Sequence, residues 1–133
     1  MTAENLSLDA SLVVLQALAI YLDLGSSNAA FVLYEGVRPT LVSTTADPSK
    51  RIVTLSLPKP SIKQLNFENV ELYPTQVGVA DKTGAVTWAR LYNGEGKAVA
   101  DFNVGDDAAI VLDDYDVLIG ASIKLDSVTL LPP

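Results

Sequence analysis

The segment Asn93-Gly94-Glu95-Gly96 is the feature that most restricts the fold of this chain. Asn and Gly accept the positive backbone φ angles of tight turns, and strand-like segments lie on both sides of it, at 85–92 and 98–104. The turn therefore predicts a β-hairpin in which these two segments pair antiparallel.

Further short segments have the apolar, β-branched or alternating composition of strands and are separated by turn residues. Pro58 and Pro60 end one of them, because proline cannot donate to a strand ladder. The inward row of Ile119, Ala121, Ile123 and Leu125 changes face near Asp126, which predicts a β-bulge or bend there. Besides the hairpin, the expected strands are 29–34, 41–45, 51–57, 62–73, 76–80, 108–112 and 119–125. About eight short strands indicate a mainly β fold, an antiparallel β-sandwich or jelly roll with one N-terminal α-helix.

Residues 7–24 are predicted to form that helix, with Ser7 or Asp9 at its start and Gly25 just after its end. Acidic residues precede its apolar run, and the run is shorter than the ~20 residues of a membrane span, so a buried helix is favoured over a signal peptide. The apolar surface extends almost all round, so we expect the helix to be covered on more than one side, by its own sheet alone or by a neighbouring subunit as well. Its candidate interface residues are Leu12, Leu15, Leu18 and Leu22.

The whole chain, 1–133, is expected to be a single domain made of this helix and a β-sandwich over 28–132. It shows no internal linker, repeat or low-complexity segment.

The composition restricts function more than it specifies it. Cysteine and histidine are absent, which removes disulfides, thiolate ligands, a cysteine nucleophile and the commonest general base. A formal net charge of -7 disfavours nucleic-acid binding. We therefore expect no enzymatic activity, no cofactor, and neither a nucleic acid nor a membrane as partner.

Five carboxylates lie close together near the C-terminal end: Asp106, Asp107, Asp113, Asp114 and Asp116. Oxygen ligands at this density make them weak Ca²⁺ candidates, although their spacing does not fit an EF-hand loop. Alternatively, they form two Asp-rich turns on either side of the strand 108–112. A third interpretation is an acidic contact surface for a basic partner.

Trp88, Arg90 and Tyr92 share one face of their predicted strand and are the remaining interface candidates. An aromatic surface with an arginine suits an interface hot spot or a carbohydrate platform. The alternative places Trp88 in the sandwich core, with Arg90 either lying along the surface or paired with Asp101 on the facing strand.

The ordered motifs of residues 78–132 resemble small β-rich accessory proteins encoded among the head and tail genes of tailed bacteriophages. The resemblance rests on Thr83-Gly84, Trp88-Ala89-Arg90, the hairpin ending at Gly96, Val99-x-Asp101, Val104-Gly105, the segment 108–114, Ile119-Gly120-Ala121 and Ser127-Val128-Thr129-Leu130, followed by a proline. This chain departs from the pattern by being longer and more charged between Pro58 and Pro74.

The resemblance implies a structural virion protein, in particular a capsid decoration or cement protein, assembled in the host cytoplasm and located in the virion. Its expected partners are the major capsid protein or other virion proteins, and copies of itself in a dimer or trimer. A tail, neck or baseplate protein is the first alternative. The second is a carbohydrate-binding β-sandwich that uses Trp88, Tyr92 or Tyr73.

Overall fold

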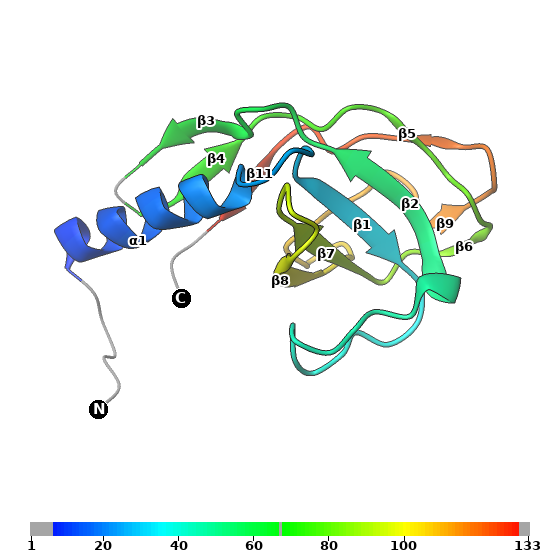
Figure 1. Cartoon of the computed structure of the whole chain (residues 1–133). Helices are drawn as coiled ribbons and strands as arrows, with labels where there is room; N and C mark the ends of the chain where they lie inside the picture. Colours follow the sequence, from blue (N-terminus) through cyan, green and yellow to red (C-terminus); the bar gives the residue numbers. More distant parts are fainter. Residues whose placement is uncertain (1–6, 67, 131–133) are drawn as a thin grey trace.

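The structure, a computed structural model, describes residues 7–66 and 68–130 and is mainly β, with one α-helix (Figure 1). Helix α1 (Leu8–Leu22) and a short 3-10 turn, η1 (Pro48–Lys50), accompany eleven strands in four antiparallel sheets within this part of the chain. The four-stranded sheet has the order β2 (Arg51–Ser56), β1 (Ala30–Tyr34), β7 (Trp88–Tyr92), β8 (Ala98–Asn103). The three-stranded sheet has the order β11 (Val128–Leu130), β4 (Val70–Leu72), β3 (Ile62–Leu65). The two-stranded sheets pair β10 (Ser122–Ile123) with β5 (Gly78–Val79) and β6 (Gly84–Ala85) with β9 (Asp116–Val117).

The mainly β, antiparallel character with one N-terminal helix is thus as predicted, whereas a sandwich or jelly roll stays a prediction. Residues 1–6 and 131–133 of the predicted single domain lie outside the described residues.

Helix α1 begins where the sequence places it, because the Oγ of Ser7 accepts a hydrogen bond from the Ala10 amide at 3.1 Å. It ends at Leu22, and Gly25 follows with a φ of 101°. One side of α1 lies against the small sheet that contains β3 and β4 (Figure 1). The opposite side carries Val13 and Ile20, which are 64% and 68% exposed. The described chain therefore covers α1 on one side, and cover from a neighbouring subunit stays a prediction.

The predicted hairpin is confirmed over Trp88–Tyr92 and Ala98–Asn103, whereas Ala85, at the start of the predicted strand 85–92, belongs to β6 and pairs with β9. β7 and β8 pair antiparallel on either side of the turn, and the Oδ1 of Asn93 accepts from the amides of Glu95 and Lys97 at 3.0 and 2.9 Å. The tip of the hairpin also docks on the end of α1, since the Gly94 amide donates to the Leu22 carbonyl at 3.2 Å. Gly94 leaves no room for a side chain, because a Cβ there would lie 2.3 Å from the carbonyl oxygen of Leu24.

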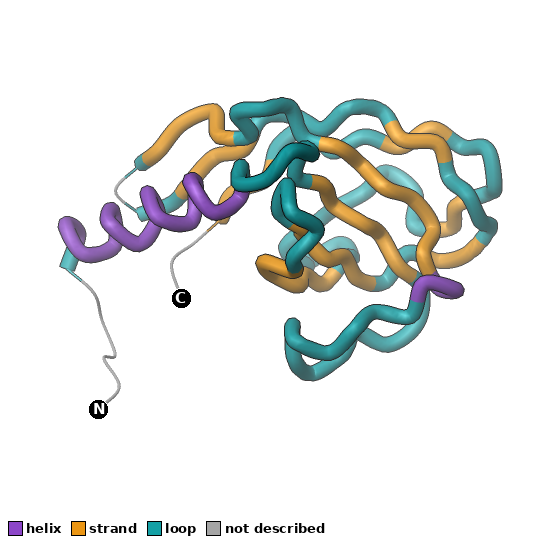
Figure 2. Tube along the Cα trace, in the orientation of Figure 1, coloured by secondary structure: helices purple, strands orange, loops and turns teal. Residues whose placement is uncertain are grey.

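Two of the predicted strands, 41–45 and 108–112, are not strands. The first lies in the long loop between β1 and β2 (Figure 2), where the carbonyls of Leu41 and Thr44 accept from an arginine side chain rather than from a strand ladder. In the second, Ile110 makes only an isolated bridge to Val104. Composition favoured strands at both places, but neither segment has a continuous partner to pair with.

The predicted kinked strand 62–73 is a hairpin of two strands, β3 and β4. The chain reverses where the Asn66 amide donates to the Asn69 carbonyl at 2.9 Å, and the Asn66 side chain donates to Asn69 and Glu71. Asparagine side chains stabilise such turns, so Asn66 and Asn69 are the sequence signal for a reversal here rather than a kink. Phe67, which was predicted within the strand, lies outside the described residues.

The C-terminal row changes face near Asp126 as predicted, but through a change of sheet. β10 pairs with β5, and after residues 124–127 β11 pairs with β4 instead. Ile119 was predicted to face inward, and it is exposed because its amide donates to the Oγ1 of Thr83 at 2.9 Å and the chain turns at Gly120, whose φ is 90°.

The core has two parts. The main cluster lies between α1 and the sheets, and Leu15, Phe31, Leu55, Leu72 and Leu91 are among its fully or almost fully buried members. In a smaller cluster, Val32, Tyr34 and Trp88 occupy alternate positions of β1 and β7 on the other face of the four-stranded sheet, and Ala46 joins them from the loop between β1 and β2.

Candidate functional site

Arg90 and Asp101 form a buried ion pair on the four-stranded sheet. They stand opposite each other in the β7–β8 register, and each side chain is only 2% exposed. The Nε of Arg90 lies 2.6 Å from Oδ1 of Asp101, and Nη2 lies 3.0 Å from Oδ2, so the contact is bidentate. The carboxylate raises the pKa of Arg90 above its ordinary value by hydrogen bonding. The predicted pairing across the hairpin is therefore confirmed.

The same guanidinium holds the loop 35–47 against the sheet. Nη1 of Arg90 donates to the carbonyl of Thr44 at 2.6 Å, and Nη2 approaches the carbonyl of Leu41 at 3.5 Å. Ala46 of this loop is buried in the smaller cluster with Val32, Tyr34 and Trp88. Figure 1 shows this loop, in cyan to green-cyan, passing beside β7 and β8. Arg90 thus anchors a loop that contains no strand or helix before Pro48.

The aromatic residues next to this pair stack on one another. The rings of Trp88 and Tyr34 are 4.5 Å apart and nearly parallel, and the Cζ of Arg90 lies 5.4 Å from the centre of the Trp88 ring. The hydroxyls of Tyr34 and Tyr92 are 2.9 Å apart. Burial, and then this hydrogen bond, raise the pKa of Tyr34 well above its ordinary value.

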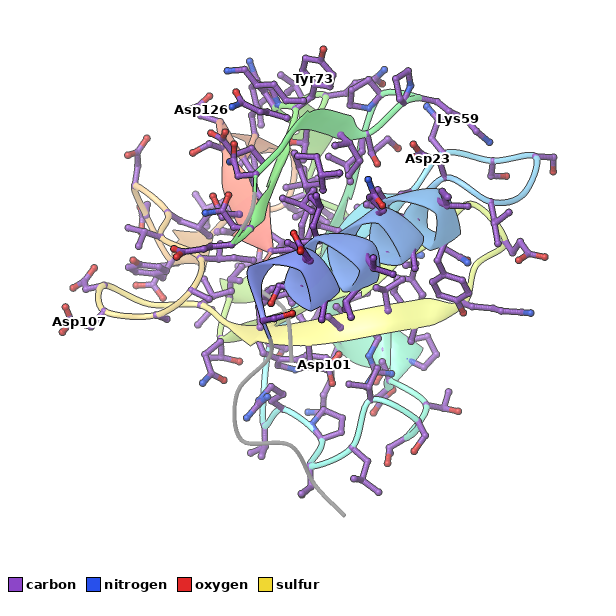
Figure 3. The ribbon with its side chains drawn as sticks, turned by 90° about the vertical axis from the view of Figure 1, so that its left-hand side faces the viewer. Asp23, Lys59, Tyr73, Asp101, Asp107 and Asp126 are labelled. Atoms are coloured by element: carbon purple, nitrogen blue, oxygen red, sulfur yellow. The ribbon has the colours of Figure 1, made fainter. Side chains whose placement is uncertain are left out.

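Trp88 is therefore a packing residue, as one of the two alternatives predicted. It is 3% exposed and lies in the smaller cluster rather than in the main core. A sugar ring binds to an exposed aromatic face, so the buried Trp88 cannot serve as the platform of the carbohydrate-binding alternative. Tyr92 is half-buried, and Tyr73 is exposed on the loop that follows β4 (Figure 3).

The four candidate leucines of α1 do not form an exposed surface. Leu15 and Leu22 are fully buried in the main core, and Leu12 and Leu18 are half-buried. A side chain without accessible surface cannot contact another chain in this conformation. Among the described side chains of this helix, Val13 and Ile20 are the most exposed large apolar groups, followed by Tyr21.

The five carboxylates of the acidic segment are spread out rather than gathered. Among the described residues, no group of three or more acidic side chains is arranged to hold a metal ion. Asp106 accepts from the hydroxyl of Tyr115 at 3.0 Å, and Asp114 accepts from the amide of Asp116 at 3.0 Å. Asp107 lies at the end of a projecting loop, on the side of the molecule away from Lys59 in Figure 3. The turn interpretation fits these hydrogen bonds, and a basic partner stays a prediction.

A groove of about 600 Å³, which was not predicted from the sequence, lies between two C-terminal segments, 109–118 and 121–127. Ile110, Val117 and Leu125 from the main core line it, and Val111 and Leu118 border it with 59% and 70% of their surface exposed. The one sequence signal for the groove is the mixture of apolar and acidic residues from 110 to 118, which lacks the regular alternation of a strand.

Comparisons of the chain with protein-family models, curated proteins and solved structures found no match. Among the described residues, the single α-helix falls short of the length and apolar character that crossing a bilayer requires.

Proposed function

We propose that the protein is a structural component of a tailed-bacteriophage virion, a capsid decoration or cement protein that stabilises the head lattice. The observation that carries the proposal is that residues of the pattern shared with the phage accessory proteins lie at positions that fix the local structure of this chain. Trp88, Arg90 and Asp101 of that pattern lie together on the four-stranded sheet, with Trp88 and the side chains of the ion pair almost fully buried. Gly96 and Gly120 have φ angles of 80° and 90°, which side-chain-bearing residues rarely adopt.

The shared pattern thus consists of residues that fix local structure, so a chain that carries it is expected to share the fold of those proteins. A sandwich or jelly-roll arrangement is part of the same proposal, supported by the antiparallel pairing within all four sheets.

The proposed role requires contacts with other chains. The described residues expose apolar side chains at separate places, including Val13 and Ile20 on α1, Val37 and Leu41 on the loop, and Leu118 and Ile119 near the groove. Exposed apolar groups on several sides suit a protein that contacts both copies of itself and a capsid surface. A homo-oligomer, dimer or trimer, with the major capsid protein as partner, is included in the proposal.

The first test is the genomic position of the coding sequence. A gene for a major capsid protein close by is the expected finding, and a position outside any phage or prophage genome would overturn the proposal.

The second test uses particles. Deleting the gene from the phage should lower the resistance of filled heads to heat and osmotic shock, and the added protein should restore it. Wild-type particles should contain hundreds of copies. A handful of copies would indicate a tail, neck or baseplate protein instead, and unchanged resistance after deletion would argue against cementing.

A further inference from the structure

We propose that the groove between residues 109–118 and 121–127 binds an extended basic segment of a partner protein, with an apolar side chain of that segment inserted between them. The groove volume of about 600 Å³ lies within the range of roughly 300–1,000 Å³ that is usual for ligand sites.

The lining of the groove is apolar at its base. Ile110, Val117 and Leu125 are buried there, and Ala121 and Ile123 are half-buried. Val111 and Leu118 stand beside them with more than half of their surface exposed. Apolar side chains gathered around a concave surface gain free energy when a partner removes them from water. An apolar side chain of the partner is therefore expected at the base.

The lining is acidic at its rim. It includes four carboxylates and one ammonium group, a net charge of -3. Asp113, Asp114 and Asp116 belong to the first segment, whereas Asp126 belongs to the second, where the Nζ of Lys124 lies 4.0 Å from its Oδ1. These four carboxylates are exposed, so an incoming Lys or Arg can reach them without a change in the chain. The charge complement of this rim is a basic segment.

The spacing of the carboxylates favours a polypeptide over a bound cation. No three acidic groups within the described part of the chain converge on one point that would suit a metal ion. Separate carboxylates instead match separate basic side chains. In an extended segment, successive side chains point to opposite sides, so alternating basic and apolar residues would reach the rim and the base together.

This inference does not depend on the proposed virion role, because it follows from the groove alone. A partner in a capsid would fit it, and so would a basic segment of any other protein. Its test therefore uses the purified full chain and synthetic peptides, without phage particles.

The experiment measures fluorescence anisotropy of labelled peptides of about nine residues: alternating lysine–leucine, alternating lysine–serine and alternating glutamate–leucine. The lysine–leucine peptide should bind best, and its affinity should fall as salt is raised from about 0.05 to 0.5 M, because exposed charges are screened. Asp113→Asn/Asp116→Asn should weaken it about fivefold or more, the loss expected for two partly exposed charge contacts. Leu118→Ser should weaken it by a similar factor.

Two variants are the matched controls. Asp106→Asn/Asp107→Asn removes the same charge outside the groove, and Ile20→Ser removes an equally exposed apolar side chain on α1. Each should change affinity less than twofold, and thermal unfolding should show all variants folded. Equal weakening by both Asn pairs would mean attraction by net charge alone and would overturn the proposal. Equal binding of the lysine–serine peptide, no binding, or a groove occupied by a second copy of the chain, seen as dissociation of an oligomer by Leu118→Ser, would overturn it as well.

Discussion

Replacing Asp101 with alanine tests how much of the fold depends on the buried ion pair. The substitution leaves the Arg90 guanidinium buried, with the Thr44 carbonyl as its remaining close partner. Both side chains of the pair are 2% exposed, and the contact is bidentate. The substitution therefore removes the charged partner of a guanidinium that is almost inaccessible to solvent in the folded chain.

The expected loss in the free energy of unfolding is about 3–5 kcal/mol, the usual cost of removing one partner from a buried pair. Small domains are stable by about 5–15 kcal/mol, so this loss is a large part of the total. For a chain of this length, a loss of 1 kcal/mol lowers the midpoint of thermal unfolding by about 3–5 °C. Asp101→Ala should therefore lower that midpoint by about 10–20 °C.

Urea unfolding followed by tryptophan fluorescence measures this directly, because Trp88 is the single tryptophan and lies beside Arg90. The matched control is Asp81→Ala. Asp81 lies 3.5 Å from Arg51 in an exposed pair, with 60% and 49% of their side chains accessible. Its loss should cost no more than about 1 kcal/mol.

A second variant separates charge from packing. Arg90→Met/Asp101→Leu replaces both charges with apolar groups and should be more stable than Asp101→Ala, because no buried charge remains unpaired. Amide hydrogen exchange in residues 35–47 should nevertheless increase, since the carbonyl of Thr44 loses its donor. The reasoning is refuted if Asp101→Ala costs no more than Asp81→Ala.

Two further substitutions test the hairpin tip and the buried tyrosine. Gly94→Ala should lower the free energy of unfolding in urea by about 2 kcal/mol or more, because the new Cβ would lie 2.3 Å from the Leu24 carbonyl oxygen. The control Gly105→Ala should change it little, because the nearest atom to a Cβ there lies at 3.8 Å. Equal effects of the two substitutions would contradict the docking of the hairpin tip on α1. Burial and the hydrogen bond to Tyr92 raise the pKa of Tyr34, so above pH ~10, the ordinary tyrosine value, the folded state keeps a proton that the unfolded state loses. The free energy of unfolding should therefore fall as the pH rises above ~10, and Tyr34→Phe should reduce this slope in urea titrations at pH ~8 and ~10.5; the same slope in both proteins would contradict the assignment.

Local signals in the sequence determined α1 and the β7–β8 hairpin. The side chain of Ser7 caps the start of the helix by accepting from a free amide, and the turn at 93–96 fixes the register that places Arg90 opposite Asp101. Each of these features involves residues that are close in sequence or joined by one tight turn. The sequence left open whether Trp88 packs inside or faces a partner, and its burial in the smaller cluster was decided by the tertiary structure.

Only the tertiary structure decided what the less regular segments do. The Val- and Thr-rich residues 41–45 have strand composition, but the carbonyl of Thr44 accepts a hydrogen bond from Arg90 of β7 instead of from a neighbouring strand. The segment 124–127 connects a strand of one sheet with a strand of another. The change of alternation near Asp126 indicated a break in the strand, but it did not specify that the chain changes sheets there.

The groove between 109–118 and 121–127 has the same origin, because residues of both segments line it and each segment contributes a strand, β9 or β10, that pairs with a distant strand, β6 or β5. The sequence determined which residues are acidic and which are apolar along these segments. Their arrangement into an apolar base and an acidic rim was decided by long-range packing, since side-chain exposure depends on neighbours that are far away in the chain.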